Sequence, residues 1–443
     1  MKENYPSHRE ILGIAGPMIL TNISIPLLGI VDTAVLGHLP DPTALGAVAI
    51  GSMVFSFVFW GFGFLRMGTT GFVARCYGAG DSTGVTTLLY QALLLAVACA
   101  IGLLLAGDLI LGAALGITEA TLPIESGAAV YFEIRIMGAP MTLATHAMVG
   151  WFLGTQNARL PMLMLLTANL TNVVLDLLFV VGFGWGVAGV AWASVTGEVL
   201  GVVVGLGWIY GRYRPGRPQW ARILQWEPIV ALVRVNTDIM IRTFFLILVF
   251  AFIPWWGAQL GPAILAANAV LINFQHFTSY ALDGFAHAAE AMAGRALGAG
   301  VAADFSRVVR RTGLWSLGVA LLFAGAYLAF GELIVAGLTD IPSVRGAALD
   351  YLPWMVLLPV VSVWSFWLDG VFIGASWARE MLFAMAISAV AAFLPAWWLT
   401  RDFGNHGLWF AFSVFMLARA LTMAVYYRLR APDEGRPARS EGI

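Results

Sequence analysis

Long apolar stretches follow one another along nearly the whole chain, and short polar segments separate them. About 20 apolar residues in an α-helix are enough to cross the hydrocarbon core of a bilayer. The stretches do not alternate apolar and polar residues, as the strands of a membrane barrel would. The pattern therefore predicts an all-α integral membrane protein.

We predict twelve transmembrane helices from these stretches. The chain has 443 residues, of which 60% are hydrophobic and 11% are charged. Because ordinary soluble domains contain roughly 25% charged residues, this composition excludes a soluble protein. The predicted spans are 10–36, 44–72, 84–106, 125–154, 160–183, 187–211, 228–256, 263–291, 308–338, 345–374, 380–399 and 405–430.

The basic residues predict the orientation of these helices, because cytoplasmic loops carry an excess of Lys and Arg. When the ends and loops are counted in order, seventeen basic residues fall on one side, and only Arg345 and Arg401 fall on the other. Both termini are therefore predicted to be cytoplasmic, in agreement with an even number of spans. The net charge of −1 gives no reason to expect a nucleic-acid partner.

Three short sequence matches relate the two halves of the chain, all at a separation of 220 residues. They are "RCYGAG" (75–80) with "RALGAG" (295–300), "GWFLGTQNAR" (150–159) with "GVFIGASWAR" (370–379), and "PTALGAVA" (42–49) with "PAILAANA" (262–269). With six spans in each half, the two copies have the same orientation. This predicts a parallel repeat about an axis along the membrane normal, as in two-lobed transporters.

The repeat and the polar connector in mid-chain predict the domain organisation. The connector is rich in Arg and Pro, and we interpret it as a cytoplasmic linker. The predicted parts are an N-terminal six-helix lobe (1–210), the linker (211–227), a C-terminal six-helix lobe (228–430) and a cytoplasmic tail (431–443).

Three polar residues of the first half have apolar counterparts in the second. An ionisable side chain at the centre of a membrane helix costs about 2.5–3.5 kcal/mol, so each one needs a reason. Asp32, Asn172 and Asp176 align, in that order, with Phe252, Ala392 and Ala396. The two-lobed fold itself therefore does not require these polar groups.

Asn172 and Asp176 are four residues apart and so share one face of a helix. If that face meets Asp32, two acids and an amide form a cation site. Two nearby acids in a low-dielectric cavity resist being ionised together, so the pair can hold a proton. Oxygen ligands suit Na⁺ equally, and Ser194 and Thr196 could add hydroxyl groups. The alternative is that the three residues only tie helices together by hydrogen bonds.

The second half has acidic residues of its own. Asp283 and Asp369 form a candidate second polar patch, for substrate or for an ion. Asp238 and Arg242 are four residues apart, and we expect them to pair with each other.

Four segments resemble the multidrug and toxic compound extrusion (MATE) family and, within it, the DinF-like branch. They are "GPMILTNISIPLLGIVDTAVLGHL" (16–39), "RCYGAGD" (75–81), "NLTNVVLDLLFVVGFGWGVAGVAWAS" (169–194) and "LDGFAHAAEAMAGRALGAG" (282–300). The resemblance implies two lobes around a V-shaped central cleft, in the bacterial inner (plasma) membrane. It implies efflux of organic, often cationic and amphipathic compounds in exchange for H⁺ or Na⁺, through rocking of the lobes.

Carried over by position, the resemblance makes Asp32, Asn172 and Asp176 the coupling-ion site. Ser194 or Thr196 would complete this site, and Pro17 would be the residue at which the first helix bends. The NorM-like branch instead has a cation site in its C-terminal lobe, with acids in the seventh and tenth helices. Past Asp238 the seventh helix of this chain has no acid, which favours the N-terminal site.

Other functions compete with that of an exporter, among them a flippase and a membrane enzyme. A flippase for lipid-linked precursors, from the same superfamily, would need more basic residues within its spans than this chain has. A membrane enzyme would need a motif such as "HExxH" or "GxSxG", and the sequence contains neither. We therefore expect a non-enzymatic, monomeric transporter with lipid and small molecules as partners and no cofactor beyond the coupling ion.

Overall fold

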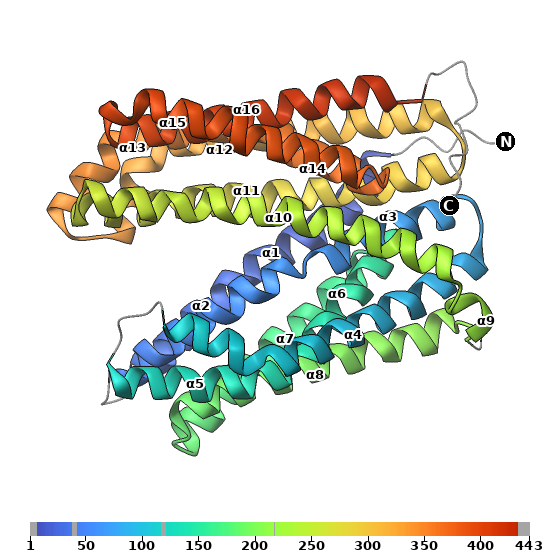
Figure 1. Ribbon diagram of the computed structural model, residues 1–443, viewed down its shortest axis with the longest axis horizontal. Coiled ribbons are helices and arrows are strands. Elements are labelled where there is room, and N and C mark those ends of the chain that lie inside the picture. The colour runs from blue at the N-terminus through green and yellow to red at the C-terminus, as the bar shows by residue number, and fades with distance from the viewer. Residues whose placement is uncertain (1–6, 38–41, 117–120, 217, 433–443) are drawn as a thin grey trace. The chain divides into compact units, whose positions relative to one another are not determined.

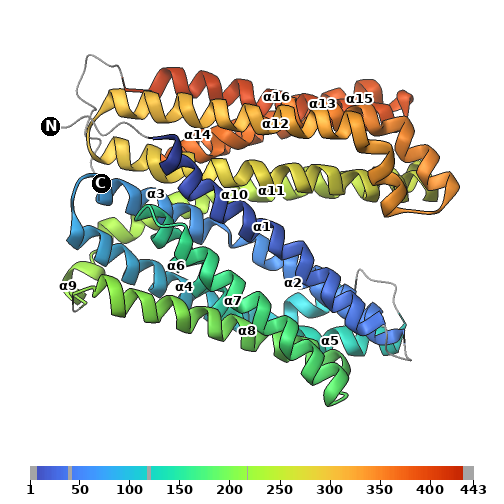
Figure 2. The ribbon, with the colours of Figure 1, turned by 180° about the vertical axis from the view of Figure 1, so that it is seen from behind.

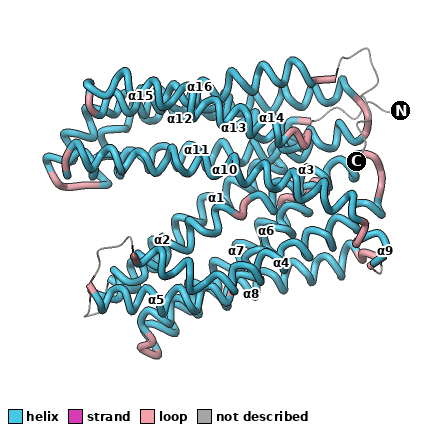
Figure 3. The backbone as a smooth tube through the Cα atoms, viewed as in Figure 1, coloured by secondary structure: helices cyan, strands magenta, loops and turns pink. Residues whose placement is uncertain are grey.

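Each of the twelve predicted spans corresponds to one helix or to a run of consecutive helices. The computed structural model describes residues 7–37, 42–116, 121–216 and 218–432, and no strand occurs within these ranges (Figure 3). Nine helices of the described chain are long and apolar enough to cross a membrane, or ten if one bent pair is a single span. The all-α membrane fold is thus confirmed. Of the predicted tail, residues 433–443 lie outside the described ranges.

The described residues of the first half form eight α-helices, which Figure 1 labels. They are α1 (His8–Gly37), α2 (Thr43–Gly61), α3 (Phe64–Gly78), α4 (Ser82–Leu115), α5 (Leu122–Met137), α6 (Ala139–Gly154), α7 (Arg159–Asp176) and α8 (Gly186–Trp208). Two short π-helical segments extend α7 and α8, namely η1 (Leu177–Gly182) and η2 (Ile209–Tyr213). The bent pair is α5 and α6, which meet at 50°.

The short helix α9 (Trp220–Ile223) lies in the predicted linker, and the second half follows it. Its helices are α10 (Trp226–Leu260), α11 (Pro262–Gly298), α12 (Ala302–Leu338), α13 (Pro342–Gly374), α14 (Ala378–Ile387), α15 (Leu394–Thr400) and α16 (Asn405–Arg430). The π-helical segment η3 (Ser388–Phe393) joins α14 to α15, and the 3₁₀ turn η4 (Arg401–Phe403) follows α15.

The chain forms two compact units. The N-terminal unit consists of Leu20–Tyr77 and Asp81–Leu232, and the C-terminal unit consists of Met1–Ile19, Gly78–Gly80 and Val233–Ile443. In the N-terminal unit α7 packs along α8, as Figure 2 shows from behind. In the C-terminal unit α13 packs against α11, α12 and α16 around buried aromatic residues such as Trp409 and Phe412.

The backbone carries the repeat that the sequence predicts. Residues with positive φ, a conformation that favours glycine, occur at equivalent positions of the two halves. The pairs are Gly80 and Gly300 (74° and 71°), Gln156 and Ser376 (65° and 59°), and Gly184 and Gly404 (71° and 59°). Each pair keeps the separation of 220 residues, so the turns after corresponding helices have the same form.

Two aligned glycines explain part of this repeat. A methyl group added at Gly150, in α6, would lie 2.5 Å from the backbone oxygen of Arg66 in α3. A methyl group at Gly370, in α13, would collide in the same way with the backbone oxygen of Ala286 in α11. Small residues allow membrane helices to approach this closely, and each half uses one at the same place.

Candidate functional site

The predicted acid pair comes together in the N-terminal unit. Asp176 is the last residue of α7 and is fully buried, and Asp32 lies in α1 and is half-buried. Their carboxyl groups interact directly. Both oxygens of Asp176 and Oδ1 of Asp32 lack a hydrogen-bond donor among the described residues. Ionised carboxylates only accept hydrogen bonds, so the two carboxyl groups need a proton or a cation between them.

Asn172 lies one turn before Asp176 and is 2% exposed. Its Nδ2 donates to the Oγ of Ser194 in α8 at 3.0 Å, which fixes the orientation of the amide. The amide oxygen is buried, and no donor in the described part of the chain reaches it. A methyl group at Gly197 would lie 2.5 Å from the backbone oxygen of Ala168, so this glycine lets α8 approach α7 beside the site.

Thr196 takes a different place from Ser194. Its hydroxyl donates to the backbone oxygen of Trp192, one turn earlier in α8, at 2.8 Å. The structure therefore joins Ser194, and not Thr196, to Asn172. Pro17 lies inside α1, which is helical from His8 to Gly37.

A buried arginine, Arg135, lies near the acid pair, but it already forms an ion pair with Glu198. Arg135, in α5, acts electrostatically on Asp32, but its Nη2 lies 3.0 Å from Oε1 of Glu198 in α8. The other oxygen of Glu198 accepts a hydrogen bond of 2.7 Å from the hydroxyl of Thr142. The guanidinium group also lies over the ring of Phe55, 3.9 Å from its centroid. Arg135 therefore has its own counterion.

Glu198 was not predicted from the sequence. It is an acid within a predicted span, and Arg135 lies within another predicted span of the same half. These two opposite charges in separate apolar spans were the available signal, because each needs a partner.

The remaining free groups of the site are all oxygens. The carboxyl oxygens of Asp32 and Asp176 and the amide oxygen of Asn172 are ligands for a proton or for a hard cation. No group of three or more His, Cys, Asp or Glu side chains in the described residues has the arrangement of a transition-metal site.

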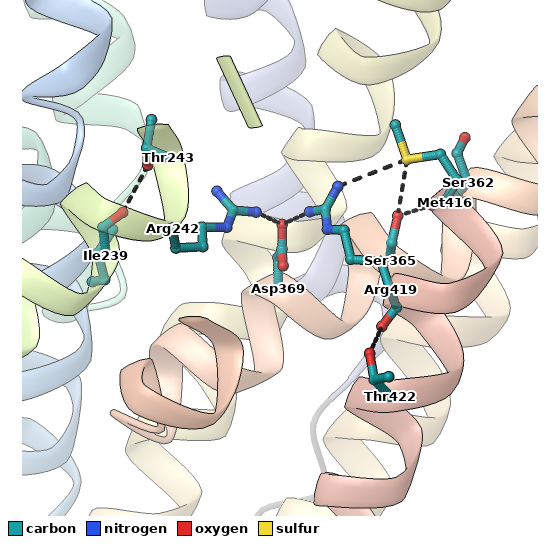
Figure 4. A network of polar contacts seen from close by, with 9 residues as sticks. All are labelled: Ile239, Arg242, Thr243, Ser362, Ser365, Asp369, Met416, Arg419 and Thr422. Carbon is teal, nitrogen blue, oxygen red and sulfur yellow. Dashed lines mark hydrogen bonds and ion pairs between the residues drawn. The ribbon is translucent and has the colours of Figure 1, made fainter. Parts of the chain in front are cut away.

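Asp369, in α13 of the C-terminal unit, lies between two arginines (Figure 4). Arg242, from α10, and Arg419, from α16, both donate to its Oδ2. The expected pairing of Arg242 with Asp238 is therefore wrong. Arg242 is 3% exposed and points into the helix bundle, whereas the cations that act on Asp238 are Arg379 and Arg234.

The other acid of the predicted second patch, Asp283, acts electrostatically on Arg419. Asp283 and Asp369 thus belong to one charged cluster. Because two guanidinium groups already neutralise Asp369, its carboxylate is not free to bind a coupling cation.

The MatE family model matches residues 17–178 and 239–398, one segment in each half of the chain. The chain belongs to the MatE family. The first MatE segment contains Asp32, Asn172 and Asp176, and the second contains Asp369. Two matches to the same MatE model also confirm the internal repeat. MatE proteins are membrane transporters, and this one is an integral membrane protein.

MatE relatives cover nearly the whole chain. The chain is 41% identical to DNA damage-inducible protein F of Escherichia coli K12 over 427 residues, which are 95% of this chain and 92% of that protein. It is 24% identical to multidrug resistance protein PmpM of Pseudomonas aeruginosa, over 94% and 90% of the two chains. The DinF-like assignment is thus confirmed.

A solved structure supports the fold. The chain matches a transporter of the MOP superfamily from Pyrococcus furiosus with a TM-score of 0.88, over 96% of this chain and 95% of that chain. The two sequences are 17% identical, so this similarity concerns the fold alone.

Proposed function

We propose that this chain is a secondary active exporter, which moves small organic compounds out of the cell in exchange for protons. The observation that carries the proposal is the contact between the carboxyl groups of Asp32 and Asp176 inside the N-terminal unit. The family supports transport, and the name of PmpM refers to multidrug resistance. Positively charged substrates are what the family resemblance predicts.

The coupling follows from the chemistry of the acid pair. Like charges this close are costly when both are ionised, so the site takes up a cation in one state and releases it in another. A ligand shifts the balance between inward- and outward-facing forms only through its different affinity for each. Proton binding at the pair and substrate binding would therefore favour opposite forms, and the lobes would rock between them.

We favour a proton over a sodium ion on the basis of ligand number. One proton can be shared by the two carboxyl groups alone, whereas hard metal cations need several oxygen ligands at once. The one further free oxygen described at the site is the amide oxygen of Asn172. A flippase for lipid-linked precursors is not favoured, because the comparisons include proteins named for multidrug resistance.

The test is uptake of a cationic dye into inside-out vesicles, with a pH gradient and a Na⁺ gradient imposed separately. We expect the pH gradient to drive uptake and Asp32→Asn to abolish the gradient-driven part. The matched control is Asp108→Asn, an exposed acid of α4 in the same unit, which should transport normally. Dye movement that ignores both gradients would rule out antiport, and full coupling in Asp32→Asn would rule out the site.

A further inference from the structure

The charged cluster of the C-terminal unit has more hydrogen-bond donors than acceptors. Arg242 and Arg419 both use Nη2 to contact the same oxygen of Asp369 (Figure 4). The Nη1 of Arg419 lies 3.7 Å from the sulfur of Met416, which is a weak acceptor. Two donors, the Nε atoms of both arginines, and one acceptor, Oδ1 of Asp369, are buried without a hydrogen-bond partner in the described residues.

These unused donors are inside the protein, where an unpaired donor is costly. The side chains of Arg242 and Arg419 are 4% and 1% exposed. A guanidinium group cannot lose its charge to relieve this cost. The cluster therefore needs an anion at all times.

The carboxylate of Asp369 is more accessible than the two arginines. The side chain of Asp369 is 12% exposed, more than either arginine. Asp283, the other acid of the cluster, is partly exposed as well, so an approaching compound meets a carboxylate before it meets a guanidinium group. Because the group that now pairs with the two arginines is a carboxylate, their positions suit a carboxylate.

We propose that Arg242 and Arg419 bind a carboxylate group of the transported compound, and that Asp369 is the resident counterion that this group replaces. The compound can carry a positive charge elsewhere, so the inference adds to the proposed export of organic compounds and rests on it. A planar guanidinium group offers parallel N–H donors that match two carboxylate oxygens. Asp283, the other acid near Arg419, would stay in place and help to neutralise the two arginines.

A matched pair of dyes tests this inference by binding alone. Rhodamine 110 has a free carboxyl group, and rhodamine 123 is its methyl ester. Fluorescence polarisation with the purified full-length protein in detergent, at neutral pH and without any gradient, gives Kd for each dye. We expect wild-type protein to bind rhodamine 110 more tightly, by roughly tenfold, the scale of a bidentate charge-assisted contact.

Two substitutions should move this ratio in opposite directions. Asp369→Asn removes the competing carboxylate and should increase the preference for rhodamine 110. Arg419→Gln should bring the ratio of the two Kd values close to one. If Arg419→Gln does not fold, Arg242→Lys replaces it: this variant keeps the charge but loses the planar guanidinium group, so the ratio should also fall. Arg401→Gln, in an exposed position of the same unit, is the control and should keep the wild-type ratio.

The inference is overturned by equal binding of the two dyes to wild-type protein, a measurement that needs no variant. It is also overturned if Asp369→Asn lowers the preference, or if the arginine variants keep it. A purely structural role of the cluster would weaken the binding of both dyes together. Because no gradient is used, a failure here leaves the proton-antiport proposal standing, and a failure of coupling leaves this result interpretable.

Discussion

At the scale of single residues, four acids within the helices, Asp32, Asp176, Glu198 and Asp369, fall into two groups. Glu198 has Arg135 as a counterion, and Asp369 has two arginines. Asp176 instead faces another acid, Asp32. A buried acid that already has a basic partner gains little from a further cation, whereas two acids in contact need one. This difference, and not the number of acids, is the reason for proposing Asp32 and Asp176 as the site of proton exchange.

Ser194→Ala tests which hydroxyl group supports the site. The substitution removes the acceptor of the Asn172 amide, and leaving a buried donor unpaired costs about 1–3 kcal/mol. We expect a lower melting temperature in detergent and slower gradient-driven dye uptake. Thr196→Val should have a smaller effect, since the Thr196 hydroxyl donates to a backbone oxygen of its own helix. Equal effects of the two variants would contradict this assignment.

The pair of Arg135 and Glu198 provides a double-mutant cycle. Glu198→Leu leaves a buried guanidinium group without its counterion, and we expect it to destabilise the protein by about 3–5 kcal/mol. Adding Arg135→Met should recover much of this loss, because the unpaired charge is then gone. Thermal unfolding in detergent measures all three variants. Strictly additive losses would show that the two side chains are not coupled.

The sequence predicted Asp32, Asn172 and Asp176 because the repeat offers an internal comparison. Glu198 was not predicted, since it was not compared with its counterpart in the second half. Arg242 was predicted to pair with Asp238, which is wrong. Both failures have one physical origin. Spacing along a helix shows which residues share a face, but not which neighbouring helix that face meets.

At the scale of helices, glycines determine how closely the elements pack. Gly150 and Gly370 occupy equivalent positions, and each lies against a backbone oxygen of a neighbouring helix. The sequence predicted the helices well because each span is a long apolar run. The sequence pattern did not reveal the bend between α5 and α6 or the π-helical ends of α7 and α8. These features depend on contacts with other helices, and hydropathy does not record them.

Gly370→Ala tests the close packing of α13 on α11. The added methyl group would collide with the backbone oxygen of Ala286, which cannot move aside as a flexible side chain can. We expect a loss of stability of about 1–3 kcal/mol, the usual cost of overpacking. Thermal unfolding in detergent measures this loss.

Gly346→Ala is the matched control in the same helix. A methyl group there meets no atom within 4 Å. Alanine is also the better helix former, by about 1 kcal/mol, so this variant should be neutral or slightly stabilised. If both variants unfold at the same temperature as the wild type, α11 and α13 are not in close contact at Gly370.

At the scale of the whole molecule, one repeated architecture carries two different chemistries. The matched turns and glycines are common to both halves, whereas the acid pair belongs to the N-terminal unit and the arginine cluster to the C-terminal unit. The repeat is what made the common architecture predictable. In the second half the acids Asp283 and Asp369 were predicted as one patch, but their arginine partners were not, because these come from α10 and α16, which are far from α13 in the sequence.

The predicted orientation determines which ends of the helices face the cytoplasm, and labelling can test it. We expect the turn with Asp402 to be outside and the linker with Gln219 to be cytoplasmic, because basic residues are concentrated on the linker side. Both side chains are exposed. In a variant with Cys76 and Cys99 replaced by Ser, Asp402→Cys should react with a membrane-impermeant maleimide in intact cells. Gln219→Cys should react only after permeabilisation.

The reverse labelling pattern would place both termini outside the cytoplasm. A proton gradient that is acidic outside would then meet the two faces of the acid pair in the opposite order. Antiport moves the compound against the flow of protons in either orientation, so an inward proton gradient would still drive export through Asp32 and Asp176. The gradient therefore sets the direction of net transport, the basic residues of the loops set which ends of the helices face the cytoplasm, and the two experiments test separate parts of the function.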